Sequence, residues 1–476
     1  MRTLKIIVSC IALLITMACR LGPDYKRPLF FDNALLEQTL NLKTPAVKTL
    51  PFRPEELKDV VLNKLIQETI NNAPDIKAAR ARVESARAMR LSLIGEILPA
   101  FDVVEQYSDN KTGKNMPPGT SGKVYEAGLS IAWEIDLFGK KQRAIEAASA
   151  QEQQMIAALE NVMVSLITEV GSAYVGLRTT QYLLEQTKED LKIQEALANL
   201  THDKYKSGLS NAIDVNQADY QVATTKAVIP KLETEIETYQ NALAVLMGKP
   251  AGSLHNQLKT TKNNLITRPF TFSLDKLYEM PVEIIRLRPD VQGMEATLKA
   301  QNAEIGVALA NMFPSISFSA LFGFKSMKLP NLMEKESFAR SYQPTVNVPL
   351  FHFGSLWQNV KAQEATKESL MAEYEKTILK ATEEIRNSLV GLKKMEGRHK
   401  ELERAWQKMD KAARLARNKY ESGLIDYLQV LDAEERRIAA QAAFTTSCGN
   451  LYQNVLNFYK AVGGQFSFNK LENETK

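Results

Sequence analysis

The chain has 476 residues, of which 45% are apolar and 24% charged, so its composition is that of a folded protein and excludes long disorder. The formal net charge is +5, and no basic block suggests a nucleic-acid partner. Three cysteines, Cys10, Cys19 and Cys448, are too few and too unevenly placed for an intrachain disulfide framework.

The N-terminal residues have the pattern of an export signal. A basic start is followed by an apolar run from Ile6 to Met17 and by the small residue Ala18. The run is too short to span a bilayer, and no later stretch offers about 20 unbroken apolar residues. Ala18 before Cys19 is similar to a bacterial lipobox, so we expect residues 1–18 to be a lipoprotein signal peptide and Cys19 to carry diacylglycerol and palmitate. Plain cleavage near this point is the alternative.

One phrase of the sequence occurs twice, 215 positions apart: "KYKSGLSNAIDV" begins at Lys204 and "KYESGLIDYLQV" begins at Lys419. The same offset relates the ends of two longer copies, repeat 1 over residues 74–248 and repeat 2 over residues 289–463. Self-similarity at a fixed offset indicates paired structural units. We therefore expect an internal duplication.

Each repeat begins with a predicted helix and a predicted β-hairpin. In repeat 1 the helix runs from about Pro74 to Leu98, because proline suits the first turn of a helix, and the hairpin covers residues 100–138. In repeat 2 the helix runs from about Pro289 to Phe313 and the hairpin covers residues 315–353.

A very long helix and a returning helix complete each repeat. Charged, alanine-rich sequence continues without proline to Gly208 in repeat 1 and to Gly423 in repeat 2, where we expect the chain to turn back. Each such helix would be roughly 100 Å long. We also expect Pro230 to kink the returning helix of repeat 1. The long helices carry coiled-coil stripes of apolar residues at steps of three or four: Met163, Leu166, Val170, Tyr174 and Leu177, and then Ile378, Ala381, Ile385, Leu389 and Leu392.

The predicted strands alternate apolar and polar residues over about nine to eleven positions, the length of a membrane β-strand. In "GLSIAWEIDLF" the apolar set is Leu129, Ile131, Trp133, Ile135 and Leu137. The last strand, "SYQPTVNVPLF", puts Tyr342, Pro344, Val346, Val348 and Leu350 on one side, and its prolines Pro344 and Pro349 suggest a strand end or seam. Four strands cannot close a barrel, and an open edge in lipid leaves backbone groups unpaired, so the barrel must be shared between chains. A soluble sandwich packed on its own helices is the alternative.

Three stretches carry a resemblance to a known family: "CRLGPDYKRP" from Cys19, "IPKLETEIETYQNALAVLMGKP" from Ile229, and "LRPDVQGMEATLKAQNAEIGVALANMFPSISFSALFGF" from Leu287. They resemble the TolC-like outer membrane factors, specifically the NodT-type lipoprotein branch that serves tripartite efflux pumps. The resemblance implies an α+β membrane protein in which three chains give four strands each to a twelve-stranded outer-membrane β-barrel. Below the barrel, it implies a long α-helical coiled-coil tunnel in the periplasm.

The resemblance also implies roles for the remaining segments. Residues 19–73 would form the N-terminal anchor and part of a periplasmic belt, residues 249–288 a connecting belt segment, and residues 464–476 a C-terminal tail. The protein would then lie in the cell outer membrane, anchored by lipid, with a long periplasmic extension.

The turns near Gly208 and Gly423 would be the tips farthest from the membrane. The resemblance implies that they contact a periplasmic adaptor protein, through Gly208, Leu209, Asp214, Gly423 and Leu424. It further implies a channel gate at Leu428 and Asp432, which match the family's "LxxLD" stretch. Threefold symmetry would make a leucine ring that gates by dewetting and a carboxylate ring that favours cations. The residues alone favour a different reading, in which Leu428 is a seam residue and Asp432 a solvated acid near a helix start, the usual role of Asp there.

No motif in the sequence indicates catalysis. His202, His255, His352 and His399 have no metal-ligand spacing, and no phosphate-binding loop or nucleophile elbow occurs, so we expect no enzyme, no metal and no cofactor.

The expected function is the outer membrane channel of a tripartite efflux system. Its expected partners are two further copies in a homotrimer, a periplasmic adaptor, an inner-membrane pump of the RND type and outer membrane lipid, but no nucleic acid. The alternatives are the exit duct of a type I protein secretion system, a lipid-anchored coiled-coil scaffold and a self-contained porin. The exported substrate is not evident from the sequence.

Overall fold

The computed structural model describes residues 20–28, 30, 40, 59–111, 122–259, 265–267 and 284–464. The predicted signal peptide, Cys19, the tail after Gly464 and parts of both belt segments lie outside these residues. The described residues form two compact units. The strand unit draws on the described residues between 20 and 28, 81 and 156, and 292 and 376, and the helical unit on those between 30 and 80, 157 and 291, and 377 and 464.

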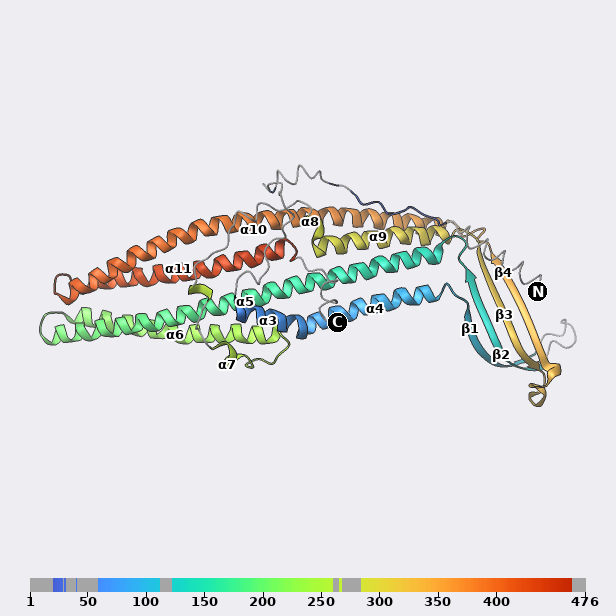
Figure 1. Cartoon of the computed structure of the whole chain (residues 1–476), viewed down its shortest axis with the longest axis horizontal. Helices are drawn as coiled ribbons and strands as arrows, with labels where there is room; N and C mark the ends of the chain where they lie inside the picture. The colour runs from blue at the N-terminus through green and yellow to red at the C-terminus, as the bar shows by residue number, and fades with distance from the viewer. Residues whose placement is uncertain are drawn as a thin grey trace. The chain divides into compact units, whose positions relative to one another are not determined.

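The main helices occur in matching pairs (Figure 1). Helices α4 (Pro74–Gly95) and α9 (Pro289–Ala310) have 22 residues each, and α5 (Lys140–Lys206) and α10 (Ser355–Glu421) have 67 each. Helices α6 (Ala212–Leu246) and α11 (Tyr427–Ala461) have 35 residues each. In every pair both ends differ by 215 positions, which is the offset of the sequence repeat.

The first helix of repeat 1 is shorter than predicted. It ends at Gly95 instead of Leu98, because the N–H groups of Ile97 and Leu98 bond three residues back, at 3.2 Å and 3.1 Å, in a tighter turn. The residue before a proline avoids the α-helical conformation, and Pro99 follows directly.

The compact units cut across the repeats. Helices α5 and α10 each contribute their first turns to the strand unit and the remainder to the helical unit. At 1.5 Å per residue, a 67-residue helix is about 100 Å long and cannot fold within one small core. The two repeats are therefore not two separate domains.

The strand unit contains one antiparallel sheet in the order β1-β2-β3-β4 (Figure 1). Its strands are β1 (Ala100–Asn110), β2 (Gly122–Ile135), β3 (Ser315–Ser326) and β4 (Phe338–Asn347). Two short 3₁₀ turns, η4 (Leu329–Asn331) and η5 (Lys335–Ser337), connect β3 to β4. Within one chain, β1 and β4 are the edges of the sheet.

The register of the sheet places the apolar side chains on one face. Trp133 lies opposite Phe318, and Phe318 lies opposite Pro344. Residues opposite each other on neighbouring strands point to the same face. The apolar face thus includes Phe101, Val103, Tyr107, Leu129, Ile131, Trp133, Ile135, Ile316, Phe318, Phe322, Phe324, Tyr342 and Val346. Asp102, Ser130, Glu134, Ser317, Ser319, Gln343 and Thr345 share the other face, so the predicted alternation is confirmed.

Two details of the strand prediction are wrong. Strand β2 ends at Ile135 and β4 at Asn347, so Leu137 and Leu350 lie beyond the strands. Pro349 also follows the end of β4, where no ladder donor is needed. Pro344 remains inside β4, which is an edge strand and the position where a sheet tolerates proline.

The long helices bury the predicted stripes in the helical unit. Met163, Leu166, Val170, Tyr174 and Leu177 of α5 are all buried. On α10, Ala381, Ile385, Leu389 and Leu392 are buried and Ile378 is half-buried. One window of α5 is long and apolar enough to cross a membrane by composition, but 56% of it is buried within the protein. The coiled-coil stripe therefore belongs to the core of the helical unit.

Short helices pack on this core: α3 (Val60–Asn72), α7 (His255–Leu258), η2 (Leu265–Thr267) and α8 (Ile284–Leu287). Asp59 caps α3 by accepting from Val61 N–H at 2.9 Å and also accepts from the Tyr174 hydroxyl at 3.0 Å. Helix α6 continues through Pro230 as one helix, and the kink there stays a prediction.

Each repeat closes on a glycine that touches the start of the same repeat. Gly248 has φ +70°, and a Cβ there would lie 2.9 Å from Pro74 Cδ. Its twin Gly463 has φ +80°, and a Cβ there would lie 3.1 Å from Pro289 Cδ. A left-handed conformation and lack of space together require glycine at both positions.

Candidate functional site

The first tip is a glycine-closed turn between α5 and α6. Gly208 has φ +73°, and the N–H groups of Gly208 and Leu209 bond to the carbonyls of Tyr205 and Lys204 at 2.9 Å and 2.8 Å. This is the hydrogen-bond pattern of a left-handed helix end. Asn211 caps α6 by accepting from the Asp214 N–H at 3.0 Å, and the Ser210 hydroxyl donates to the Asp214 carboxylate at 2.8 Å. Asp214 therefore helps to order the tip.

The second tip has the same backbone. Gly423 has φ +74°, and Leu424 N–H bonds to the Lys419 carbonyl at 2.8 Å. Asp426 occupies the N-cap position of α11 without a side-chain hydrogen bond. Leu209 and Leu424 are equivalent in the repeat, and both are exposed at the ends of their hairpins. Each tip thus presents an uncovered aliphatic side chain beside a glycine.

The two tips pack together through two tyrosines that the sequence analysis missed. Tyr420 and Tyr427 are buried in a cluster with Leu197, Ala198 and Ala218 of the first hairpin. Thr201 and Tyr420 share a hydroxyl hydrogen bond of 2.9 Å. Burial raises the pKa of Tyr420, and burial raises the pKa of Tyr427 to about 12, so both stay neutral. The equivalent Tyr205 is exposed, so the repeated phrase gave no signal of this difference.

A buried charge network joins the two hairpins above the tips. Arg437 of α11 donates to Asp190 of α5 at 2.6 Å and to Glu434 at 2.8 Å, and Arg417 of α10 lies 3.1 Å from Glu434. Burial opposes the charge of Arg437, but the hydrogen bonds that Arg437 donates to Asp190 and Glu434 outweigh it and raise the pKa of Arg437. Burial also raises the pKa of Asp190, against the opposing effect of Arg437. No spacing in the sequence linked α5 to α11, so this network was not predicted.

The candidate gate residues lie one turn apart on α11. Leu428 is 61% exposed within one chain. The Asp432 carboxylate is also exposed and accepts a 2.9 Å hydrogen bond from Arg436. The predicted carboxylate is therefore accompanied by a cation that the sequence analysis did not consider.

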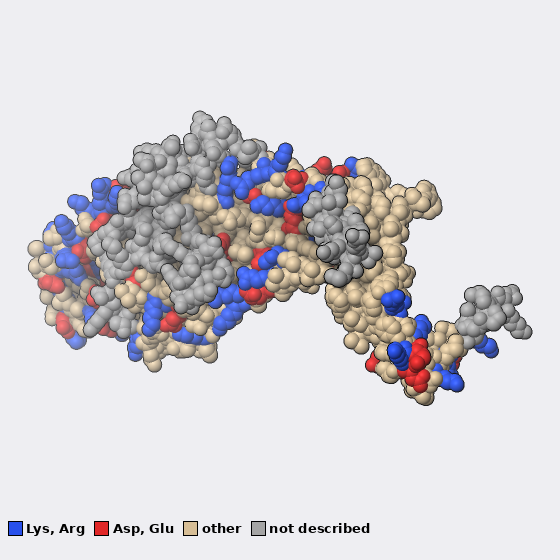
Figure 2. All heavy atoms as spheres, turned by 45° about the vertical axis from the view of Figure 1, so that its right-hand side comes forward, with Lys and Arg blue, Asp and Glu red and all other residues tan. Residues whose placement is uncertain are grey.

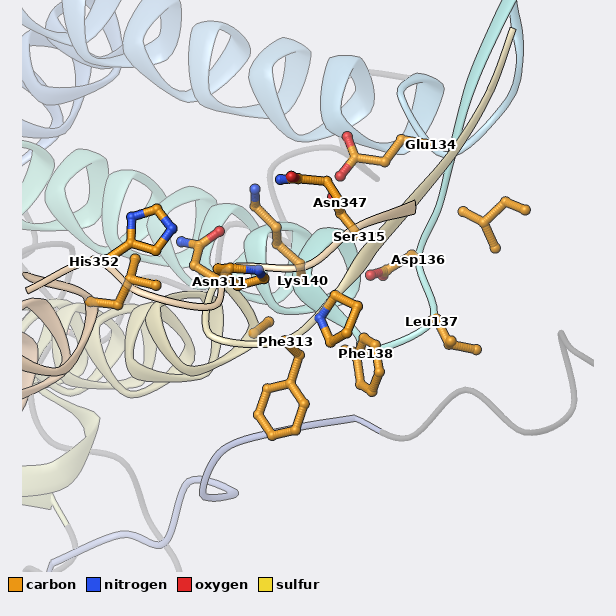
Figure 3. Close-up of a pocket in the computed structure, with 15 residues that line it drawn as sticks. Glu134, Asp136, Leu137, Phe138, Lys140, Asn311, Phe313, Ser315, Asn347 and His352 are labelled. Atoms are coloured by element: carbon orange, nitrogen blue, oxygen red, sulfur yellow. The ribbon is translucent and has the colours of Figure 1, made fainter. Parts of the chain in front are cut away.

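The polar face of the sheet ends in a small cavity within the strand unit. The cavity has a volume of about 280 Å³, and Figure 3 shows polar side chains around it, from the ends of the strands and the start of α5. Among them, Glu134, Ser315 and Asn347 lie on the polar face by register. Asp136 accepts from the Gln142 N–H at 2.9 Å and caps the start of α5.

Charges are sparse over the middle of the sheet and gather at the strand ends farthest from the helices, as Figure 2 shows. Lys325 pairs there with Glu126 at 3.0 Å. Glu105 and Arg340 also lie on the apolar face by register, but most of that face is uncharged, which suits an apolar surrounding.

A segment directly after Cys19 is fixed onto the strand unit by one arginine. Arg143 is only 1% exposed, and its guanidinium donates to the carbonyls of Leu21 and Gly22, each at 2.8 Å. It also pairs with Asp24 at 3.1 Å. Gly139, where β2 passes into α5, leaves room for this segment, since a Cβ there would lie 3.0 Å from the Arg20 Cα. Cys19 itself lies outside the described residues, but its neighbour is placed beside Gly139.

Among the residues that the structure describes, no three His, Cys, Asp or Glu side chains gather as a metal site would require. His399 lies 3.9 Å from the Cys448 sulfur, and its other ring nitrogen is 2.8 Å from the Ser447 hydroxyl. Burial raises the pKa of Cys448 to about 11, so its thiol stays protonated.

Comparison with known proteins identifies relatives over nearly the whole chain. The family model described as outer membrane efflux protein matches twice, over residues 65–249 and 280–464. The chain is 30% identical over 420 residues to the antibiotic efflux pump outer membrane protein ArpC of Pseudomonas putida, covering 85% of this chain and 83% of that protein. It is 30% identical over 477 residues to the solvent efflux pump outer membrane protein SrpC of Pseudomonas putida, covering 96% and 97%. The solved outer-membrane channel OprN superposes with a TM-score of 0.82 at 28% identity, covering 94% of this chain and 99% of that one.

Proposed function

The chain belongs to the outer membrane efflux protein family, and from this premise we propose that three copies form one continuous channel across the outer membrane and periplasm. It is an outer membrane channel component of an efflux pump. A transport role leaves no need for a catalytic centre, and the family is not one of enzymes.

The observation that carries the shared barrel is the sheet of the strand unit. Its four strands have one apolar face, and the edges β1 and β4 have no partner within the sheet. Unpaired backbone groups cost several kcal/mol each in lipid, so a membrane sheet must close on itself. Three sheets of four strands, joined β4 to β1, give the twelve strands of a closed barrel.

A duplicated hairpin accounts for the tunnel. The two stretches matched by the family model begin at residues 65 and 280, again 215 positions apart, and the paired helices have equal lengths. Two equivalent hairpins per chain give six in a trimer, which approximates sixfold symmetry in a wall of antiparallel helices.

At the far end of the tunnel, the exposed tips are the contact surface for a periplasmic adaptor, which links the channel to an inner-membrane pump of the RND type. Gly208, Leu209, Asp214, Gly423 and Leu424 form this surface. Leu428 and Asp432 form the gate, with Arg436 balancing part of the carboxylate charge. A ring of leucines can close a narrow pore by dewetting.

Lipid on Cys19 anchors the chain in the outer membrane. The docking of residues 21–24 by Arg143 supports this assignment, because Arg20, which directly follows the cysteine in the sequence, lies beside Gly139 at the junction of strands and helices. That junction is where a barrel wall would leave the membrane, so an acyl chain there reaches lipid.

The exported substrates are small apolar or amphipathic molecules. The relative ArpC is named as part of an antibiotic efflux pump, and SrpC as part of a solvent efflux pump. The polar face of the sheet would line the duct through which these molecules leave.

Single-channel conductance of the purified full-length protein in a planar bilayer tests the proposal. Wild type should give small, cation-preferring currents, and a Leu428→Ala, Asp432→Ala double variant should conduct clearly more. Equal, large currents from both proteins would refute the gate and retain the channel. Absence of current from both would refute the shared barrel.

A further inference from the structure

Helices α6 and α11 flank α5 in the helical unit, and a groove runs along α5 between them. The groove has a volume of about 630 Å³, within the range of about 300–1,000 Å³ that is usual for small-molecule sites. A Cβ on Gly176 of α5 would lie 2.6 Å from the Tyr239 ring of α6. A Cβ on Gly449 of α11 would lie 3.2 Å from Thr179 Cγ2 of α5. Close packing at these two contacts fixes the walls of the groove.

The lining of this groove is neutral and rich in hydroxyl groups. None of the 14 described residues that line it has a charged side chain. Leu183 of α5 and the Tyr239 ring supply apolar surface. Thr238 of α6 and Thr446 and Asn450 of α11 supply hydroxyl and amide groups. The groove therefore suits a molecule that has an apolar body and a neutral hydrogen-bonding group.

Repeat 2 does not have this composition at the equivalent positions of α10. Lys394, Met395 and Arg398 correspond to Thr179, Thr180 and Leu183, at the offset of 215. Two cations and a thioether thus replace two hydroxyl groups and a leucine. The neutral lining is therefore a property of α5 and not a consequence of the duplicated fold.

One buried hydroxyl group in the groove is unused. Helix α5 has five threonines, and four of them donate to the carbonyl four residues back, at 2.8 or 2.9 Å: Thr168, Thr179, Thr187 and Thr201. Thr180 is the fifth. It is 6% exposed and lines the groove, and within the described part of the chain its hydroxyl has no hydrogen-bond partner. A buried hydroxyl without a partner is unfavourable, so a molecule that bonds to Thr180 is stabilised in the groove.

The groove lies on the face of α5 that points away from α7. Thr179 lines the groove, whereas Gln181 donates to the Leu258 carbonyl of α7 at 2.8 Å. Successive residues of a helix are about 100° apart, so residues two apart point in nearly opposite directions. In the channel proposed above, the belt segment that contains α7 surrounds the tunnel. The groove on the opposite face of α5 would then open into the lumen.

We propose that this groove is a binding site for uncharged amphipathic small molecules on their way through the tunnel. The apolar body of the molecule packs on Leu183 and the Tyr239 ring, and its hydrogen-bonding group meets the Thr180 hydroxyl. A charged molecule is disfavoured, because the lining has no opposite charge and burying an unpaired charge costs far more than burying a neutral polar group. This inference rests on the proposed function and adds to it a site within the duct.

Protection of an introduced thiol from alkylation tests the groove. In the full-length Cys448→Ser protein, Thr446→Cys places a thiol at the exposed rim of the groove. The rate at which N-ethylmaleimide alkylates position 446 is followed by peptide mass. We expect 1-naphthol, an uncharged aromatic alcohol, to lower this rate at least threefold at saturation. 1-Naphthoate, which has the same rings and a negative charge, should leave the rate unchanged.

Two matched controls accompany this measurement. Val245→Cys in the same background reports non-specific partition of 1-naphthol, since Val245 is exposed on α6 and is not among the described residues that line the groove. Thr180→Val removes the free hydroxyl and should raise the 1-naphthol concentration for half-protection at least threefold. Thr187→Val should leave that concentration unchanged, because the Thr187 hydroxyl already donates to the Leu183 carbonyl at 2.8 Å.

Each part of the inference can fail separately. No protection at position 446, or equal protection at positions 446 and 245, would overturn the binding site. Equal protection by 1-naphthoate would overturn the uncharged class of ligand, and unchanged half-protection in Thr180→Val would overturn the role of Thr180. Conductance of the same protein separates these failures from that of the proposed function. Conduction without protection would overturn the groove alone, whereas protection without conduction would overturn the channel alone.

Discussion

Asp432 and Arg436 lie one turn apart on α11 and form an exposed pair with a 2.9 Å hydrogen bond. A pore lined by three such carboxylates would carry three guanidinium groups beside them, so its charge is partly balanced. Exposed pairs of this kind contribute about 1 kcal/mol or less to stability, and their main effect is on the local potential.

Ion selectivity should therefore respond in opposite directions to the two residues. Arg436→Gln leaves the carboxylate ring unbalanced, and we expect a higher cation-to-anion permeability ratio. Asp432→Asn leaves the arginines, and the ratio should fall below that of wild type. Reversal potentials in a salt gradient measure both variants. Identical reversal potentials for all three proteins would place Asp432 away from the conducting path.

The buried network between the hairpins should be far more important for stability than the exposed pair. Arg437→Met leaves Asp190 and Glu434 buried without their shared partner, and breaking a buried pair in this way costs about 3–5 kcal/mol. Arg436 directly precedes Arg437, and Arg436→Met removes only the exposed pair with Asp432, so it should cost less than about 1 kcal/mol of stability. Chemical unfolding of both variants, followed by circular dichroism, gives the comparison. Equal losses would mean that Arg437 is not the residue joining the hairpins.

The periodic features of the fold were predictable because each has a local cause. Alternation in "GLSIAWEIDLF" identified a strand with one apolar face, and the stripe from Met163 to Leu177 identified a long amphipathic helix. The offset of 215 positions predicted that equivalent helices begin at equivalent residues of the two repeats, such as Pro74 and Pro289.

The missed features depend on contacts between distant segments. Arg437 meets Asp190 across 247 positions of sequence, and Tyr420 is buried while its twin Tyr205 is exposed. Equivalence in a repeat predicts equal backbone but not equal surroundings. The ends of β2 and β4 were overestimated because apolar residues such as Leu350 continue the alternation after hydrogen bonding has stopped.

The tip glycine should tolerate alanine poorly although space is available. Gly423 has φ +74° and no atom within 4 Å of an added Cβ, so Gly423→Ala introduces only backbone strain, about 1 kcal/mol. Gly397 in α10 also has free space around it but has no positive φ, and Gly397→Ala should stabilise by up to about 1 kcal/mol. Thermal unfolding of the two variants should shift in opposite directions. A stabilised Gly423→Ala protein would rule out the left-handed turn.

Stability should fall in mild acid because of His399. Burial lowers the pKa of His399 against the opposing charge of Glu403, so the unfolded chain binds the proton more readily. The folded state therefore gains its full stabilisation from neutral His399 above the ordinary histidine pKa of about 6.5, and loses it as the pH falls below that value. In the His399→Gln variant, the midpoint of unfolding should change less with pH between about pH 7 and pH 5 than it does in wild type. An unchanged slope would show that protonation of His399 is not coupled to folding.

Removal of the Arg143 side chain should release the segment that follows Cys19. Arg143→Gln loses the ion pairs with Asp24 and Glu146 and part of the bonding to the Leu21 and Gly22 carbonyls. Leaving these half-buried acceptors without a donor costs at most about 1–3 kcal/mol each, enough to undock a short segment. We expect the endoproteinase Lys-C, which cuts only after lysine, to cleave after Lys26 in the variant and not in wild type.

The released fragment also reports the anchor, because it contains residues 19–26. Its mass should exceed that of the peptide by a diacylglycerol and a fatty acyl group, and Cys19→Ser should abolish the increment. Arg90→Gln is the control, since Arg90 lies in the same unit and donates its hydrogen bond to Glu152, at 2.5 Å, and not to residues 20–28. Cleavage in the Arg90 variant would attribute the release to general loosening of the unit, and an unmodified fragment would refute lipid on Cys19. Release of the peptide reports the docking by Arg143, and the mass of the same peptide reports acylation of Cys19. Either prediction can therefore be refuted while the other is confirmed.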